Sequence, residues 1–166
     1  MIRKAIIKDL DRIMVILKKI IDEMHSYNNY QWDENYPQAK DFAVDIEKGE
    51  LYVSVRENMI VGFICINRVE PHEYEGLNWS STKDALIIHR MGVDTDYRNA
   101  GIGKELVGFA EDLAHRSNVK YLKTDTNSLN AKAQALFQKC RYIFVGEMSF
   151  RGKEKPFYCY EKVLEG

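Results

Sequence analysis

The sequence predicts a mixed α/β fold of about seven strands and about four helices. Two kinds of apolar pattern support this: recurrence at helical spacing in four segments, and short alternating or continuous runs in seven others. Their order along the chain, β-α-α-β-β-β-α-β-α-β-β, is typical of helices that cover a single sheet. With 166 residues, 45% of them hydrophobic, the chain can bury one continuous core. We therefore expect residues 1–166 to form one domain.

The N-terminal elements are predicted by a change of period. A short strand-like run covers residues 2–7, and Asp9 then offers an N-cap to an amphipathic helix over residues 10–24. The stretch 25–40 is rich in Asn, Tyr, Trp and acidic residues and shows no period, which indicates a loop. A second helix is expected near residues 42–47.

The rest of the chain alternates strands with two further helices. A turn-like Glu57-Asn58 separates the strands of a hairpin, and the polar segment 69–83 is typical of a long connection at a sheet edge. Further elements are expected as strands at 51–55, 60–66, 85–93, 119–126, 142–150 and 157–164, and as helices at 102–113 and 129–140.

Composition argues against several classes of function. The 24 Lys and Arg residues nearly cancel the 25 Asp and Glu residues, so no global positive field attracts nucleic acid or an anionic membrane. The N-terminus does not resemble a signal peptide, and no run is apolar enough to span a bilayer. The three cysteines lack the spacing of a metal site or a disulfide framework. We expect a cytoplasmic protein without a metal.

The most informative segment lies between Met91 and Lys104. A buried strand ends, a polar turn follows, and Gly101 and Gly103 open an amphipathic helix. The N-terminus of a helix carries unpaired N–H groups and a partial positive charge, and glycines let an anion approach them. The segment lacks the patterns of a dinucleotide fingerprint and of a nucleotide P-loop. A pyrophosphate is the group that such a turn would bind.

This segment resembles the signature [QR]-x-x-G-x-[GA] of the GCN5-related N-acetyltransferase (GNAT) family, which is met by Arg98-Asn99-Ala100-Gly101-Ile102-Gly103. A second motif of the family is resembled by the segment from Asn130 to Tyr142. The resemblance covers nearly the whole chain. It implies a sheet splayed between its fourth and fifth strands and an enzyme that transfers an acetyl group from acetyl-CoA to an amine.

Carried onto this sequence, the resemblance implies a set of cofactor-binding residues. Backbone amides from Asn99 to Lys104 would hold the pyrophosphate of coenzyme A, Arg98 would shape the turn, and Asn130 would bond the pantetheine arm. The strand ending at Val93 would pair with that arm as if it were an added strand. The full set is Met91, Gly92, Val93, Arg98, Asn99, Ala100, Gly101, Ile102, Gly103, Lys104, Asn130 and Phe137.

Amide formation needs an uncharged amine and a stabilised oxyanion. For the oxyanion we expect the backbone N–H of Val93 or a neighbour. For the base there are two candidates: Asp125, at a place where some members of the resembled family carry a glutamate base, and His89, whose unperturbed pKa suits proton transfer near neutrality. Either could instead be structural, His89 as a bonded core imidazole and Asp125 as a helix cap or as a partner of Lys123. Phe137 stands where the family usually has a tyrosine acid, and Arg141 replaces a family glycine.

Acceptor binding is expected in the two loop regions that flank this side of the fold. Aromatic rings with carboxylates would suit a cationic amine, although such side chains are also common on solvated surfaces. We expect a small-molecule amine, with a peptide or protein N-terminus, a longer acyl donor and a non-catalytic acyl-CoA-binding module as alternatives. The run Phe157–Tyr160 fits a buried strand or a homodimer contact. The acceptor residues are Trp32, Tyr36, Glu70, His72, Glu73 and Tyr74.

Overall fold

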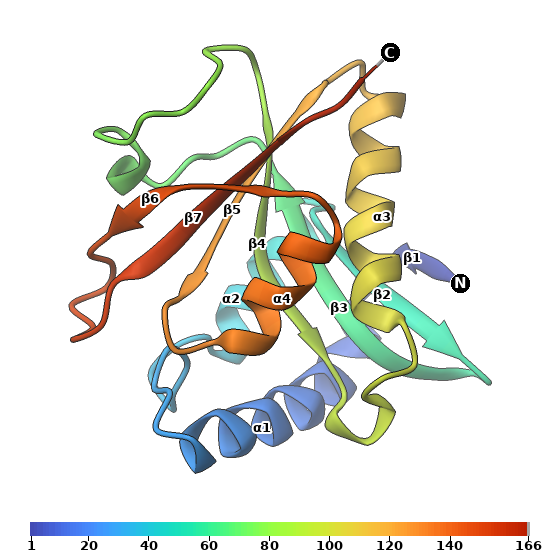
Figure 1. Ribbon diagram of the computed structural model, residues 1–166. Helices are drawn as coiled ribbons and strands as arrows, with labels where there is room; N and C mark the ends of the chain where they lie inside the picture. The colour runs from blue at the N-terminus through green and yellow to red at the C-terminus, as the bar shows by residue number, and fades with distance from the viewer. Residues whose placement is uncertain (166) are drawn as a thin grey trace. The chain divides into compact units, whose positions relative to one another are not determined.

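The computed structural model describes residues 1–165, and its helices and strands follow the predicted order (Figure 1). Within that range, no helix is long and apolar enough to cross a membrane. Short 3-10 helices occur at 7–9, 72–74 and 95–97. The strands are β1 Ile2–Lys4, β2 Leu51–Arg56, β3 Met59–Asn67, β4 Leu86–Val93, β5 Tyr121–Asn127, β6 Ile143–Met148 and β7 Phe157–Val163, and the helices are α1 Leu10–Ser26, α2 Ala39–Glu47, α3 Ile102–Arg116 and α4 Ala131–Lys139.

The strands form one mixed sheet in the order β1-β2-β3-β4-β5-β7-β6. Strands β4 and β5 are parallel, and their pairing joins Leu86–Ile88 to Leu122–Thr124. In the described chain this pairing ends there, although β4 continues to Val93 and β5 to Asn127. The predicted mixed seven-stranded sheet with a splay between its fourth and fifth strands is confirmed.

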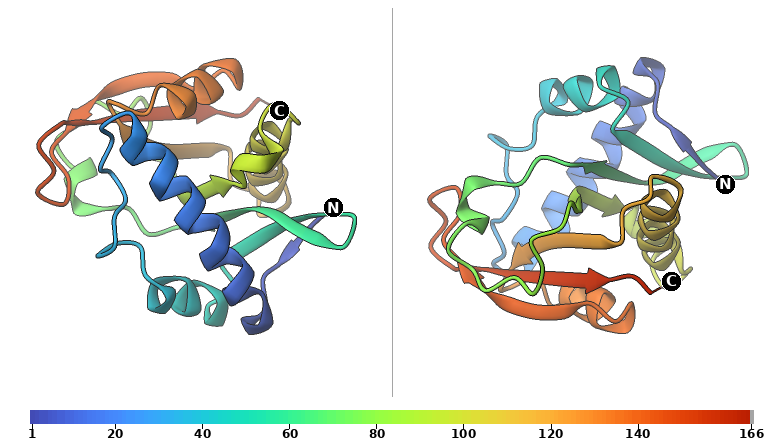
Figure 2. Two further views of the ribbon diagram at one scale, coloured as in Figure 1. Left: turned by 90° about the horizontal axis from the view of Figure 1, so that it is seen from below. Right: turned by 90° about the horizontal axis from the view of Figure 1, so that it is seen from above.

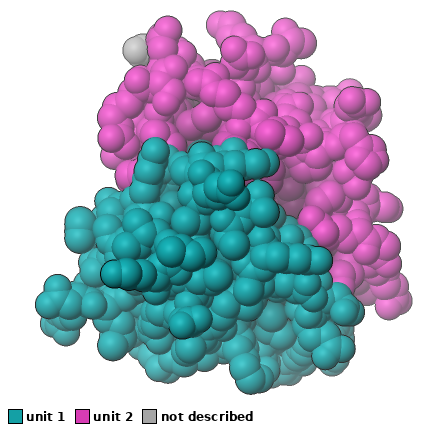
Figure 3. All heavy atoms as spheres, turned by 180° about the vertical axis from the view of Figure 1, so that it is seen from behind, with its two compact units in different colours: residues 1–66, 90–106 teal, residues 67–89, 107–166 magenta. Residues whose placement is uncertain are grey.

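The chain divides into two compact units, shown in different colours in Figure 3. Unit 1 comprises residues 1–66 and 90–106, and unit 2 comprises residues 67–89 and the chain from Val107 onward. Strand β4 and helix α3 each contribute residues to both units. A single domain over residues 1–166 stays a prediction.

In unit 1, helices α1 and α2 cover one face of the hairpin β2–β3 (Figure 2). The apolar stripe of α1 includes Ile13, Ile16 and Ile20, which pack with alternate residues of the two strands. The turn of the hairpin is formed by Glu57 and Asn58, both with positive φ, as the sequence predicted. The core of unit 1 thus fixes α1 against the strands.

Two glycines allow close approach in unit 1. A Cβ on Gly92 would lie 2.5 Å from Ile20 Cδ1 and 2.7 Å from Phe63 Cζ, which no side chain tolerates. On Gly62 it would lie 3.2 Å from Ile102 Cγ2, at the start of α3. Glycine at position 92 is therefore required by the packing of α1 against the end of β4.

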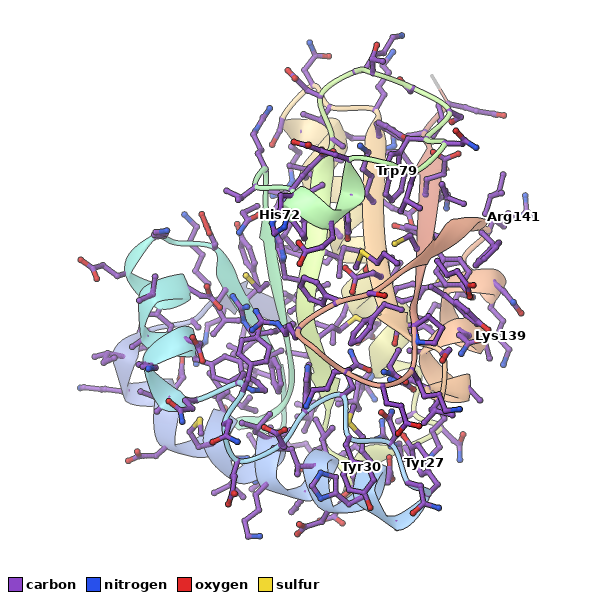
Figure 4. All side chains as sticks on the ribbon, turned by 90° about the vertical axis from the view of Figure 1, so that its left-hand side faces the viewer. Tyr27, Tyr30, His72, Trp79, Lys139 and Arg141 are labelled. Carbon is purple, nitrogen blue, oxygen red and sulfur yellow. The ribbon has the colours of Figure 1, made fainter. Side chains whose placement is uncertain are left out.

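In unit 2, the start of β4 lies beside β5, and β7 lies between β5 and β6 as an inner antiparallel strand. The segment 68–85, which carries the labelled His72 and Trp79 in Figure 4, contributes Tyr74 to the buried core. Alternate residues of β7 are buried in that core, which accounts for the aromatic run Phe157–Tyr160. A homodimer stays a prediction.

Each helix ends with a residue of positive φ in a Schellman arrangement. For α4, the amide of Tyr142 donates to the carbonyl of Phe137 and that of Arg141 donates to Gln138. Asn and Gly are the usual residues at this position, and three helices use Asn28, Gly49 and Asn118. The fourth uses Arg141, with φ 68°. Although Arg141 replaces a glycine of the family pattern, the turn keeps its left-handed backbone geometry.

The start of α1 differs from the prediction in one contact. Asp9 stands at the N-cap position, but its carboxylate makes no capping bond to α1. It accepts hydrogen bonds from Arg3 Nη1 and from the amide of Ile6, both 2.8 Å long. These bonds, the Arg3 bond foremost, hold the pKa of Asp9 below its usual value.

Candidate functional site

The segment 94–104 of unit 1, here called the phosphate turn, presents unpaired amides at the start of α3. Its backbone passes through positive φ at Asn99 (64°) and Gly101 (79°). The first intrahelical bond runs from the amide of Glu105 to the carbonyl of Gly101, 3.0 Å away. The amides of Ile102, Gly103 and Lys104 precede that bond and have no carbonyl four residues before them in the helix. The turn therefore presents N–H donors with the positive end of the helix dipole.

Asp94 anchors the phosphate turn to α1. Its carboxylate is fully buried and accepts hydrogen bonds from Arg12 Nη2 at 2.5 Å, Lys19 Nζ at 3.2 Å and the amide of Asp96 at 3.0 Å. Burial acts to raise the pKa of Asp94, but the Asp96 amide and the two cations outweigh it and lower the pKa. Asp94 is thus a charged carboxylate that fixes where the turn begins.

Two further ion pairs join α1 to the same turn. Lys19 Nζ also lies 2.8 Å from the exposed carboxylate of Asp96. Arg98 Nη2 donates to Glu23 Oε1 at 2.5 Å, which directs the Arg98 side chain toward α1. The sequence predicted that Arg98 shapes the turn, and the structure pairs its side chain with Glu23. The sequence did not predict the anchoring residues Arg12, Lys19, Glu23 and Asp94.

The phosphate turn fits a diphosphate sterically and electrostatically. A Cβ built on Gly101 meets no atom within 4 Å, so the turn borders open space at this residue. Asn99, Ala100, Gly101 and Lys104 are exposed, whereas Ile102 is buried in the helix contact. Open space, free N–H groups and a helix N-terminus together make an anion-binding cradle.

Met91 and Val93 are partly buried at the end of β4, and Gly92 between them is buried. The close packing of Ile20 and Phe63 is a sufficient reason for glycine at 92. The amide of Asp94 is bonded to the carbonyl of Val61 at 2.8 Å. A contact of residues 91–93 with a cofactor stays a prediction.

Asn130 is the N-cap of α4 in unit 2. Its Oδ1 accepts a hydrogen bond of 3.1 Å from the amide of Ala133, which leaves its Nδ2 as the group that could donate to a ligand. Phe137 is 2% exposed, with its ring 5.7 Å from that of Tyr142 and 5.8 Å from that of Tyr160. The side chain of Phe137 thus has a packing role, and its predicted contact with cofactor is not tested.

A pair of functional groups meets at Asp125 on β5. Asp125 is a partly buried residue, and its carboxylate accepts a hydrogen bond of 2.6 Å from Tyr74 Oη, while the Tyr74 side chain is buried. Burial raises the pKa of Asp125 to about 6, against the lowering effect of the Tyr74 bond. Burial and the nearby carboxylate raise the pKa of Tyr74 well above 10. Asp125 can therefore change its protonation state close to neutral pH.

His89, the other candidate base, lies at the end of the unit 2 part of β4. Its Nε2 is 2.6 Å from Oδ1 of Asn67, and the side chain is partly buried. An amide oxygen can only accept, so this geometry makes Nε2 the protonated nitrogen. His89 is thus held as a donor at Nε2, and a role as the base stays a prediction.

The acceptor candidates of unit 1 have partners within that unit. Trp32 is 6% exposed in the core, with its ring 6.4 Å from Phe63. Tyr36 Oη accepts a hydrogen bond of 2.6 Å from Arg90, which also binds both carboxylate oxygens of Asp45. These contacts give Trp32 and Tyr36 structural roles, and a role in acceptor binding stays a prediction.

The acceptor candidates of unit 2 include Glu70, which is bonded to Lys123, and the pair His72 and Glu73. Glu70 accepts a short hydrogen bond from Lys123 Nζ, which also lies 4.4 Å from the ring centroid of Trp79. His72 and Glu73 are 3.2 Å apart, with the His72 side chain 87% exposed. A cavity of about 640 Å³ is lined by Arg68, Glu70, Leu77, Trp79, Ser81, Thr82, Lys83, Asp84, Ala85 and Lys123.

One group of side chains in the described chain has the spacing of a metal site: Asp45, Glu50 and Cys65, with ligand atoms within 4.8 Å. Asp45 is already bonded by Arg90 through two nitrogens. Burial raises the pKa of the Cys65 thiol to about 12, so without a metal the thiol stays protonated near neutral pH. The arginine supplies the positive charge at this place.

Comparison with known proteins identifies the family. The model of the acetyltransferase (GNAT) family matches residues 17–142. None of the curated proteins matches the chain.

Solved structures share the fold over the full length. A GNAT-family acetyltransferase of Streptococcus agalactiae is 22% identical with a TM-score of 0.89, covering 100% of this chain and 96% of its own. A protein of Staphylococcus aureus Mu50 is 29% identical with a TM-score of 0.79 and covers 99% of both chains. The yncA protein of Salmonella typhimurium, solved with its cofactor acetyl-CoA, is 14% identical with a TM-score of 0.72, covering 99% and 94%.

Proposed function

We propose, on the premise that this chain belongs to the GNAT family of acetyltransferases and uses acetyl-CoA, that it acetylates a primary amine of a small molecule. The acetyl donor follows from the family, and the acceptor class is the proposal. The observation that carries it is the carboxylate of Asp125, which accepts a hydrogen bond from Tyr74 and whose burial raises its pKa to about 6. A carboxylate of that pKa accepts a proton from an ammonium group at neutral pH more readily than an ordinary aspartate does.

The phosphate turn is proposed to hold the diphosphate of the donor. Its amides before Glu105 would donate to the phosphate oxygens, and the α1 anchors at Asp94 and Arg98 would keep those amides aimed without contacting the ligand. The side-chain Nδ2 of Asn130 would donate to the pantetheine arm, since its Oδ1 is bonded to Ala133. Acetyl-CoA, when bound, supplies the activated acetyl carbon.

Proton removal is the part of the reaction that needs a side chain. An alkylammonium has a pKa near 10.4, so freeing the amine at pH 7 costs about 4 to 5 kcal/mol. We assign that proton to the Asp125 carboxylate. The amine nitrogen then forms the bond to the acetyl carbon and releases its second proton to water, the carbon–sulfur bond breaks, and the electron pair leaves with the sulfur. The backbone N–H of Val93 is proposed to stabilise the oxyanion.

No tyrosine acid is needed to complete the cycle. Phe137 is buried between two tyrosine rings and has no proton to donate. A thiol has a pKa near 8.5, so departure as thiolate at pH 7 lies only about 2 kcal/mol above the protonated product. The proton on Asp125 can return to the thiolate through water. The presence of Asp125 favours this enzyme over a non-catalytic acyl-CoA-binding module.

A panel of acceptors tests the proposal. Polyamines, amino acids, aminoglycosides and peptide N-termini are incubated with acetyl-CoA and the protein, with mass shift and thiol release as readouts. We expect a small amine to gain one acetyl group with matching thiol release, and Asp125→Asn to lower the rate while leaving acetyl-CoA affinity unchanged. Acetyl-CoA binding without acceptor-dependent thiol release for any member would favour the binding module, and acetylation of peptides alone would overturn the small-molecule class.

A further inference from the structure

We infer that Tyr74 is a positioning residue for Asp125: its hydroxyl donates to Oδ2 of Asp125 and holds that carboxylate as the proton acceptor. This inference rests on the proposed function. The sequence places Tyr74 among the acceptor-binding residues, but its side chain is only 1% exposed. It therefore acts through Asp125 instead of touching the acceptor, and its hydroxyl lies 2.6 Å from the carboxylate.

The position of Tyr74 is itself fixed by its neighbours. The indole Nε1 of Trp79 donates to the carbonyl of Tyr74 at 2.8 Å, and the two rings lie 4.9 Å apart. The ammonium of Lys123 lies over the indole ring and is paired with Glu70. Trp79 thus supports the main chain and the ring of Tyr74 from one side. A hydroxyl held in this way has little freedom to leave the carboxylate.

Tyr74, which lies 51 residues away in the sequence, donates a hydrogen bond to Asp125. Arg151, on the turn between β6 and β7, acts through its charge to lower the pKa of Asp125, and Glu73 acts to raise it. Cys159, which pairs with Asp125 across β5 and β7, stays a neutral thiol because burial raises its pKa. The Tyr74 bond is the first contribution that opposes burial, so its loss would raise the pKa of Asp125 further.

Tyr74→Phe tests the inference because it removes the hydroxyl and keeps the ring. Loss of a donor to the charged form should raise the pKa of Asp125 by about 1 unit. The acid limb of the kcat/KM profile should move to higher pH by the same amount, so that the rate at pH 6 falls about fivefold while the rate at high pH changes little. Acetyl-CoA affinity should not change.

Tyr121→Phe is the matched control. Tyr121 is also a buried tyrosine of unit 2, and its hydroxyl donates to Glu161 at 2.5 Å, away from Asp125. Tyr121→Phe also removes a tyrosine hydroxyl oxygen and the hydrogen bond that it donates to a carboxylate. We expect its pH profile to coincide with that of the unmodified protein, whatever the loss of stability.

Carbon-13 NMR of the Asp125 carboxyl, without substrates, separates the two proposals. A higher Asp125 pKa in Tyr74→Phe, together with the moved acid limb, supports the inference. An Asp125 pKa that Tyr74→Phe leaves unchanged overturns it, and the base role of Asp125 is then still judged by Asp125→Asn. A carboxyl pKa that moves while the acid limb stays, with Asp125→Asn fully active, overturns the proposed base and the inference with it.

Discussion

The buried carboxylate of Asp94 is bonded to Nη2 of Arg12 at 2.5 Å, which ties the end of β4 to helix α1. The same carboxylate accepts from Lys19 and from the amide of Asp96. The phosphate turn therefore starts from a fixed point, although none of these side chains belongs to the family signature. Replacing Asp94 should therefore disturb the amides of residues 102–104, which its side chain does not contact.

Asp94→Ala should raise the KM for acetyl-CoA about tenfold and lower the free energy of unfolding by about 2 kcal/mol, because Arg12 and Lys19 lose a buried partner. Steady-state kinetics and urea unfolding measure the two effects. Asp96→Ala is the control, since its 70% exposed side chain pairs with Lys19 at the surface and its loss should change stability by less than about 0.5 kcal/mol. Equal KM values in both variants would contradict the anchor.

Asp125→Asn should make the protein slower and more stable at once. The folded-state pKa of about 6 lies above the usual 3.8, so the folded protein binds the extra proton between these values. Its stability therefore falls as pH rises from about 4 to 6 and stays lower above that range. Asparagine does not titrate, so Asp125→Asn removes this loss of unfolding free energy, which is about 2 to 3 kcal/mol at pH 7.5. Urea unfolding at pH 4 and pH 7.5 measures it, and equal differences at both would refute the raised pKa.

Arg141→Gly should stabilise the protein by about 0.5 to 1 kcal/mol, because φ 68° strains a side chain but not a glycine. Arg141 follows the end of α4 and is exposed (labelled in Figure 4), so the change removes little packing. Lys139→Gly, within the helix, should instead cost about 1 kcal/mol. Chemical unfolding of both variants measures the contrast, and a destabilised Arg141→Gly would show that the arginine makes a contact worth more than the strain.

The order of the elements could be predicted from the sequence because apolar periodicity is local. The ends of β1 and β6 were predicted too long, since a run of apolar residues does not show where pairing stops. The helix end at Arg141 was left open, because the Schellman bonds and not the residue type set its geometry.

The candidate site also has parts that the sequence could predict and parts that it could not. The phosphate turn is a contiguous motif, so its residues could be named from the sequence. The contacts that position it, such as Arg12 with Asp94, join residues 82 apart, and Tyr74 reaches Asp125 across 51. Only the fold brings such pairs together. Tyr74 was expected at the acceptor, and the structure shows a buried side chain whose hydroxyl donates to Asp125.

Gly101→Glu bears on the central claim, that the phosphate turn binds the diphosphate of acetyl-CoA. Its carboxylate would enter the open space that the turn borders at this residue and occupy the anion cradle. Gly101→Ala carries the same backbone strain without the charge, and Gly152→Glu carries both at another glycine of positive φ (64°) with open surroundings. Circular dichroism of all three should show the unmodified fold.

Calorimetric titration of acetyl-CoA into these variants is the most direct measurement. The account predicts an affinity at least about tenfold weaker for Gly101→Glu, from roughly 1.4 kcal/mol or more of lost binding free energy, and affinities close to that of the unmodified protein for Gly101→Ala and Gly152→Glu. A folded Gly101→Glu that binds acetyl-CoA as tightly as the unmodified protein would contradict it.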